Sequence, residues 1–139
     1  METLTRLLPL ILCIALLLCG CIGPGAQDWE SEPLAKDYVL VRSSVHNISL
    51  GQGNDGLYTT VVPPEVRAVA CDEAFICLQQ VDMPDAGAEV PEDAPVYYYI
   101  VVVADGQVYG PCSETEYAEK VQALGVPELP WRDVQTFRP

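Results

Sequence analysis

Short runs of apolar and β-branched residues, separated by turn-forming residues, fill the chain from position 38 to position 110. The runs are rich in Val, Ile, Tyr and Thr, which favour the pleated, half-buried surface of a sheet. Gly, Pro, Asn and Asp between the runs favour tight turns. The pattern therefore predicts short strands at residues 38–42, 45–50, 57–62, 66–71, 75–81, 96–104 and 107–110.

The connections between these runs predict antiparallel pairing. Asp72 and Glu73 separate two runs that are too close for anything but a hairpin. Asp105-Gly106 follows the longest run, and Asp-Gly is a strong hairpin signal because both central residues of the tight turn require positive φ. Turns are also expected at residues 51–56 and at Pro63-Pro64.

One segment near the carboxyl end has the pattern of a helix. Ser113 and Glu116 match a capping box, and Gly125 is a typical stop signal. Between them apolar residues recur on one helical face at Tyr117, Val121 and Leu124. We therefore expect an α+β fold, an antiparallel β-meander of about five to seven short strands with one C-terminal helix packed on the sheet, and then an irregular tail.

The amino end is the most hydrophobic part of the chain, with no charge in residues 7–22 and a basic side chain at Arg6. A membrane-spanning helix needs about 20 apolar residues, whereas the apolar part of a secretory signal has about 7 to 15. Residues 18–21, Leu-Cys-Gly-Cys, resemble the lipobox of bacterial lipoproteins. The resemblance implies cleavage before Cys21 and a lipid on its sulfur. Ordinary signal cleavage nearby, or an uncleaved anchor with Cys21 incidental, remain alternatives.

These features predict three regions: a lipoprotein signal peptide at 1–20, a lipidated Cys with an acidic Gly/Pro linker at 21–37, and a small α+β domain at 38–139. The expected location is the cell membrane or the outer membrane, lipid-anchored and outside the cytoplasm. Acidic linker residues such as Asp28 and Glu32 would be repelled by anionic lipid. Membrane association is therefore expected from the lipid alone.

The charge is strongly acidic, with 20 Asp and Glu against 7 Lys and Arg and a net charge of -13. Loss of residues 1–20 would leave this net charge unchanged, because Glu2 and Arg6 go together. A nucleic-acid partner is excluded, since it requires clustered Lys and Arg. Such a charge steers basic partners toward the protein instead.

Much of the remaining chain resembles a family of small uncharacterised bacterial lipoproteins. The strings DYVLVRSSVHNISL at 37–50, VRAVACDEAFICLQQ at 66–80 and YYYIVVVADGQVYGPCSETEY at 97–117 carry the resemblance. The matching positions are Arg42, Ser43, Ser44, His46, Tyr109, Gly110 and Pro111. The resemblance implies the architecture and the location but no activity. The chain departs from the family at Cys71, Cys77 and Cys112.

These three cysteines form an odd set once Cys21 is lipidated, so at least one thiol is free or intermolecular. A hairpin loop of even length would direct Cys71 and Cys77 to opposite faces of the sheet, whereas an odd loop or a bulge would bring them together. Free buried thiols are the favoured interpretation, ahead of one disulfide and of a redox or metal role. No Cys-x-x-Cys or Cys/His metal spacing occurs, so no metal or cofactor is expected.

His46 is the only histidine and follows Ser44 and Arg42 at alternate positions. On a regular strand the three side chains would share one face and are candidate ligand contacts. Neighbours two apart are about 7 Å from each other, beyond the reach of a nucleophile and its base, so no catalytic residue is expected. A polar row that satisfies loop backbone groups, or a small anion or carboxylate held by Arg42, are the alternatives.

Two further features have ordinary structural explanations. The acidic stretch at 82–93 lacks the spacing and the glycine of a calcium loop, so a solvated, mobile loop is expected. Tyr97, Tyr98 and Tyr99 alternate between faces, which leaves an outward ring for docking unless the helix covers it. We expect a non-enzymatic binding or structural lipoprotein of the cell envelope, with a basic envelope protein as a candidate partner. An acidic inhibitor or shield against a cationic envelope-attacking enzyme is the alternative, and a hydrolase or redox enzyme is the weakest.

Overall fold

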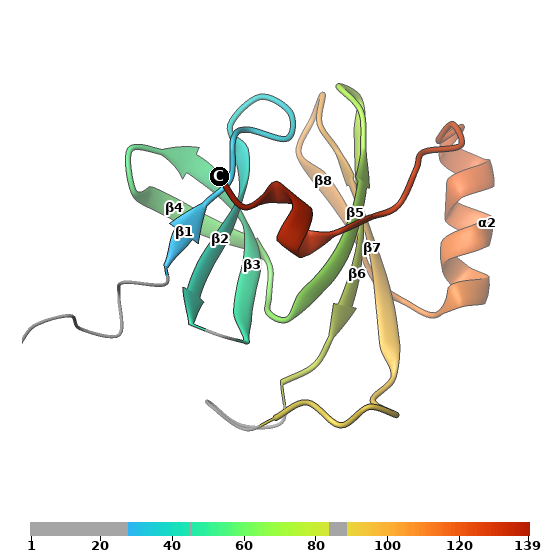
Figure 1. Ribbon diagram of the computed structural model, residues 1–139. Helices are drawn as coiled ribbons and strands as arrows, with labels where there is room; N and C mark the ends of the chain where they lie inside the picture. Colours follow the sequence, from blue (N-terminus) through green and yellow to red (C-terminus); the bar gives the residue numbers. More distant parts are fainter. Residues whose placement is uncertain (1–27, 45, 84–88) are drawn as a thin grey trace, which may run out of the picture.

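The computed structural model describes residues 28–44, 46–83 and 89–139. In this part of the chain two antiparallel sheets and one α-helix form three layers (Figure 1). The expected antiparallel fold with a C-terminal helix is confirmed. The described residues form nine strands, more than the five to seven expected, and the strands divide between two sheets.

The first sheet has the order β1-β2-β3-β4 and contains β1 (Trp29–Glu30), β2 (Tyr38–Ser44), β3 (Asn47–Asn54) and β4 (Leu57–Val62). The second has the order β8-β7-β6-β5-β9 and contains β5 (Val66–Cys71), β6 (Phe75–Val81), β7 (Val96–Val102), β8 (Gln107–Cys112) and β9 (Arg132–Asp133). Helix α2 (Glu114–Leu124) follows β8, and the 3-10 helix η2 (Val134–Phe137) follows β9.

The folded part begins earlier than the expected boundary at Tyr38. β1 pairs with β2, and the Ser31 hydroxyl accepts a hydrogen bond from the backbone N–H of Leu40 at 2.9 Å. At the other end the expected irregular tail contains β9, which pairs with β5 through Val69 and Arg132. Both strands have two residues, too few to leave a period in the sequence.

The two glycine turns differ from what their sequences predict. Asp55 and Gly56 have φ of 51° and 77° and join Asn54 of β3 directly to Leu57 of β4, so this is the tight turn with two positive φ angles. Residues 51–54, expected to be part of the turn, belong to β3. The hairpin at Asp105-Gly106 is confirmed, but only Gly106 has positive φ and the loop begins earlier. The predicted tight-turn geometry was therefore wrong there.

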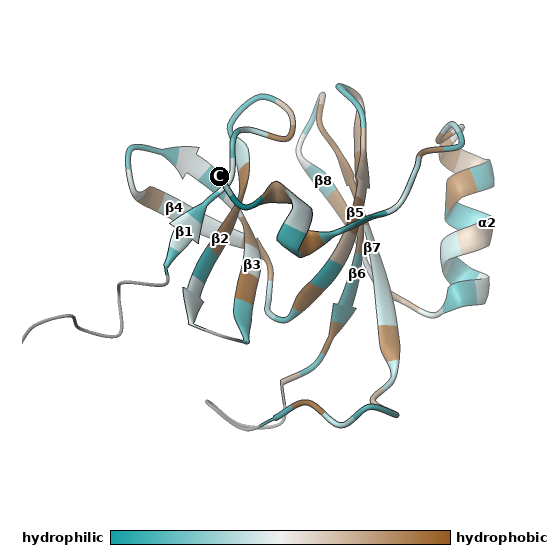
Figure 2. Cartoon of the chain, in the orientation of Figure 1, coloured by the Kyte–Doolittle hydropathy of each residue, from teal (hydrophilic) through white to brown (hydrophobic). Residues whose placement is uncertain are grey.

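The second sheet is buried on both faces, which explains the long apolar runs of its central strands. Along β6, Ile76 and Leu78 pack into a first core between the two sheets, whereas Cys77 packs into a second core under α2. Figure 2 shows hydrophobic positions concentrated in the strands and mostly hydrophilic connecting loops. Strands covered on both sides lose the alternation that marks a half-exposed strand.

Helix α2 has the ends that its sequence predicts. The Ser113 hydroxyl accepts from the backbone N–H of Glu116 at 3.2 Å, and the Glu116 carboxylate accepts from the backbone N–H of Ser113 at 2.7 Å. Gly125 ends the helix with φ of 70°, and the N–H of Val126 donates to the Val121 carbonyl at 3.0 Å. Among the described residues, no helix is long and apolar enough to cross a membrane.

Candidate functional site

The three candidate contact residues lie around the connection between β2 and β3. β2 ends at Ser44, and its pairing with β3 shifts between Arg42 and Ser44, where a bulge interrupts the alternation of side chains. Arg42 is 9% exposed, Ser44 is exposed, and the side chain of His46 in the turn is 34% exposed. One regular strand therefore does not carry all three, and a ligand contact by them stays a prediction.

His46 lies instead beside Glu65, a residue that no motif in the sequence indicates. The Glu65 carboxylate is 3.8 Å from the Nδ1 atom of His46 and 3.3 Å from the Nη2 atom of Arg67. Glu65 is 7% exposed and stands in the segment that crosses from the first sheet to the second. Glu65 is the single acidic residue between Asp55 and Asp72, and this isolated charge among strand residues is the signal in the sequence that could have indicated it.

The backbone around Glu65 is held firmly. Its N–H and carbonyl both bond to the backbone of Val81 at 2.9 Å. The buried Gln80 side chain donates to the Pro64 carbonyl at 3.0 Å and to the Asp82 carboxylate at 3.0 Å. The carboxylate is therefore fixed between one permanent cation and one imidazole.

This arrangement is a charged junction of one carboxylate, one imidazole and one guanidinium. A serine or cysteine nucleophile needs a base within hydrogen-bond reach. The side-chain contact that the structure shows for His46 is with the carboxylate of Glu65. The cluster links the first sheet to the second, because His46 lies between β2 and β3 whereas Glu65 and Arg67 lie at the start of β5. A protonated His46 would add a second cation next to the nearly buried carboxylate.

The cysteines Cys71, Cys77 and Cys112 are free thiols. Cys71 pairs with Ile76 and Ala70 pairs with Cys77, so the hairpin loop is even and the first two thiols face opposite sides of the sheet. Cys77 and Cys112 are buried and Cys71 is half-buried. Burial raises the pKa of all three thiols, which disfavours the thiolate and its reactivity.

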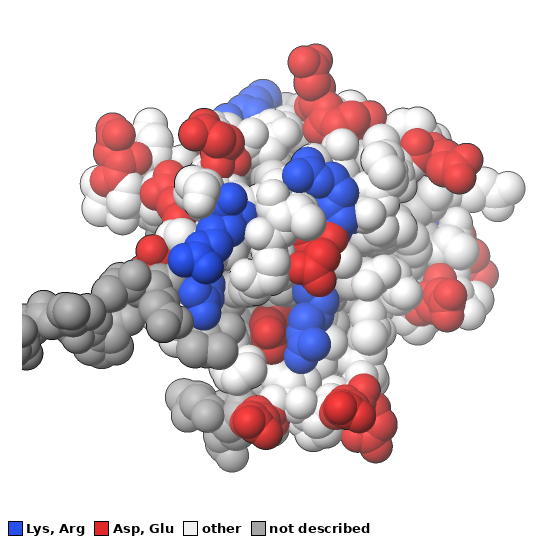
Figure 3. Space-filling view, viewed as in Figure 1, with Lys and Arg blue, Asp and Glu red and all other residues white. Residues whose placement is uncertain are grey.

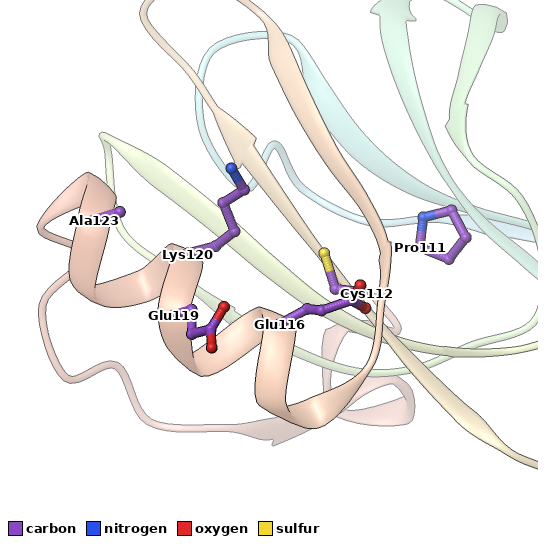
Figure 4. A pocket seen from close by; sticks show the side chains of 6 residues that line it. All are labelled: Pro111, Cys112, Glu116, Glu119, Lys120 and Ala123. Carbon is purple, nitrogen blue, oxygen red and sulfur yellow. The ribbon is translucent and has the colours of Figure 1, made fainter.

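A shallow hollow of about 360 Å³ lies between β8 and α2. In Figure 4 the side chains of Cys112, Glu116 and Lys120 border it from the strand and from successive turns of the helix. The Lys120 ammonium also lies 4.9 Å from the centre of the Tyr109 ring. Cys112 is only 8% exposed, so the hollow offers its thiol little access.

Helix α2 covers the outward ring of the tyrosine run. Tyr98 stacks on Tyr117 with ring centres 4.8 Å apart, and Trp131 lies against both rings at 6.3 and 6.1 Å. Tyr99 points the other way and is 7% exposed in the first core. The aromatic run is therefore largely packing between the sheet, the helix and the tail.

The acidic loop and the lipobox lie partly or wholly outside the described residues. Of the loop, residues 84–88 are not described, and residues 89–95 are mostly exposed. Within the described ranges no cluster of three or more His, Cys, Asp or Glu side chains could hold a metal ion. Cys21 also falls outside these ranges, so its lipidation stays a prediction.

The fold and the site define a small two-sheet antiparallel domain with one covering helix and a carboxylate fixed between two basic side chains. The chain belongs to the DUF3997 family, described as a protein family of unknown function, whose model matches residues 35–135. The expectation of an uncharacterised domain family is thus confirmed. No curated protein and no solved structure matches the chain.

Proposed function

We propose that this protein is a lipid-anchored lipoprotein of the bacterial cell envelope, exposed outside the cytoplasm, which acts by binding or as a structural component and not as an enzyme. The observation that carries the proposal is the lipobox-like sequence at residues 18–21, directly after an uncharged apolar run. Two acyl chains on Cys21 would anchor the protein stably, because each buried methylene contributes about 0.8 kcal/mol.

The start of the fold suits a short tether. Trp29 of β1 follows Cys21 by only eight residues, which span at most about 28 Å when fully extended. β1 is an edge strand of the first sheet, and α2 lies at the far side of the molecule (Figure 1). In an anchored protein the first sheet would therefore lie nearer the membrane, and α2 would be available to soluble partners.

The chemistry of the described residues supports a non-catalytic role. The three thiols are held in their neutral form, because burial raises the pKa of each. The imidazole of His46 contacts a carboxylate that also contacts Arg67. Both sets of groups favour structural stability over nucleophilic attack.

Palmitate labelling of growing cells tests the anchor. The Cys21→Ala protein should lose the label and leave the membrane fraction, because the thioether needs that sulfur. The Cys19→Ala protein is the matched control, because Cys19 lies two residues from Cys21 in the same apolar segment. It should keep both the palmitate label and its place in the membrane fraction. Labelling that persists in Cys21→Ala, or that is lost equally in Cys19→Ala, would disprove the proposal.

Exposed acidic residues favour a second candidate function, the inhibition of a cationic envelope-attacking enzyme. Glu114 and Glu119 lie exposed on α2, the last turn of which has no basic side chain. Binding to a lysozyme-type enzyme should weaken strongly with added salt, and it should weaken again in the Glu114→Gln/Glu119→Gln variant. Affinity that is equal at low and high salt would exclude this candidate.

A further inference from the structure

Two arginines line one hollow on the face that carries the chain's carboxyl end. The hollow has a volume of about 400 Å³ and lies between the segment after β1, the end of β5 and η2. Its lining includes Arg132, Arg138, Phe137, Leu34 and Glu32. Figure 3 shows basic side chains spread over this face, with acidic side chains among and around them.

These arginines are unusual because carboxylates are abundant in this chain. Acidic residues outnumber basic ones by 20 to 7, and Arg67 accordingly contacts Glu65 at 3.3 Å. Neither Arg132 nor Arg138 forms an ion pair with a carboxylate of the described residues. Their charges are therefore available to a ligand that enters the hollow.

Local contacts hold Arg132 in place at this hollow. The guanidinium of Arg132 stacks on the Phe137 ring, with its Cζ atom 4.1 Å from the ring centre. β9 pairs with β5, and Asp133 caps η2 by accepting from the backbone N–H of Gln135 at 2.8 Å. A stacked guanidinium keeps its N–H edge free while losing little further rotamer freedom on binding.

We propose that this hollow binds the phosphate group of a small soluble ligand through Arg132 and Arg138. A single carboxylate is satisfied by one guanidinium fork, whereas the oxygens of a phosphate point in several directions and can accept from two forks. Leu34 and Phe137 offer an apolar wall to an organic part of the ligand. Glu32 and the carboxyl end of the chain at Pro139 also line the hollow, and both oppose the anion and limit the affinity.

The net charge of the protein favours a small anionic ligand over a large one. With a net charge of -13 the molecule repels an anionic polymer or bilayer over the screening length of about 8 Å at physiological salt. A small phosphate enters the hollow and contacts the arginines directly, where their local attraction dominates. The proposal does not depend on lipidation of Cys21.

Calorimetric titration of the full-length protein in a non-ionic detergent with inorganic phosphate, against chloride at equal ionic strength, tests this site. Phosphate should bind and chloride should not. Arg132→Gln and Arg138→Gln should each weaken phosphate binding by about tenfold or more, because each variant loses the charge-assisted hydrogen bonds of one guanidinium group. Glu32→Gln should strengthen it. Arg132→Lys keeps the charge but loses the planar fork, and it should weaken binding as well.

Lys120→Gln is the matched control, because it removes one positive charge on the opposite side of the second sheet and should change nothing. Circular dichroism of every variant confirms that it is folded. Vesicles of phosphatidylglycerol form a second arm and should not bind through these arginines. Three results would each overturn the proposal. The first is equal heats for phosphate and chloride, and the second is phosphate binding that is unaffected in a folded Arg132→Gln variant. The third is that phosphate does not bind, whereas vesicles bind the unmodified protein and not the Arg132→Gln variant.

Discussion

Gly110 occupies a position in β8 that should accept no side chain. Its φ is 141°, in a region that residues other than glycine rarely adopt. A Cβ atom there would lie 2.6 Å from Cδ1 of Tyr99 and 2.8 Å from the carbonyl oxygen of Tyr98. Tyr99 is 7% exposed within the first core, so its ring has little room to move away. Gly110→Ala should therefore destabilise the fold strongly.

Two terms set the size of the effect. A methyl group that meets the nearly buried Tyr99 ring at this distance costs about 1–3 kcal/mol, and forcing alanine into this backbone region costs about 1–3 kcal/mol more. The sum of about 2–6 kcal/mol is a large part of the 5–15 kcal/mol by which such a domain is stable. Gly125→Ala is the control, because φ is 70° there and nothing lies within 4 Å. It should cost only about 1–2 kcal/mol.

Urea unfolding followed by tryptophan fluorescence and by circular dichroism measures both variants. The free energy of unfolding should fall further for Gly110→Ala than for Gly125→Ala, with similar slopes against urea. Each kcal/mol should also lower the melting temperature by about 4–8 °C. If the two variants lose the same stability within about 0.5 kcal/mol, the close contact between β8 and the Tyr99 ring is wrong.

Three further predictions concern the helix cap, the thiols and the charged junction. Ser113→Ala should cost about 1 kcal/mol in urea unfolding, because the α2 backbone loses its cap, and an unchanged midpoint would contradict the capping box. Burial raises the pKa of the Cys77 thiol above its usual 9.0. The stability that this shift represents is complete below that value and is lost as pH rises through the pKa of the folded state. Between about pH 8 and about pH 10.5 the urea midpoint should therefore fall less for Cys77→Ala than for the unmodified protein. His46→Ala and Arg67→Ala should each lower the free energy of unfolding by about 0–1 kcal/mol near neutral pH. The double variant should lose more than the sum of the two, because Glu65 then keeps neither basic neighbour. Strictly additive losses would argue against the junction.

Local features of the fold could be read from the sequence because their causes are local. The capping box at Ser113, the stop at Gly125 and the seven main strands depend on residues within a few positions of each other. The even hairpin loop that separates Cys71 from Cys77 was likewise one of the arrangements open in the sequence. Its parity decided which faces the thiols occupy.

The candidate site depended on contacts between distant segments. Nothing near His46 in the sequence indicates Glu65, which approaches it only because the chain crosses there from one sheet to the other. The bulge at the end of β2 removed the regular alternation that would have aligned His46 with Arg42. A single sequence does not reveal a bulge, because one extra residue shifts the register without changing composition.

The sequence by itself determined the uncharged apolar run at residues 7–22, the net charge of -13, the strands and the helix, since each follows from composition or short-range period. Only the tertiary structure decided how the strands divide into two sheets, which carboxylate meets His46, and which arginines share a hollow. Those outcomes depend on how the faces of the strands are buried against each other, and burial joins residues that are far apart in the chain.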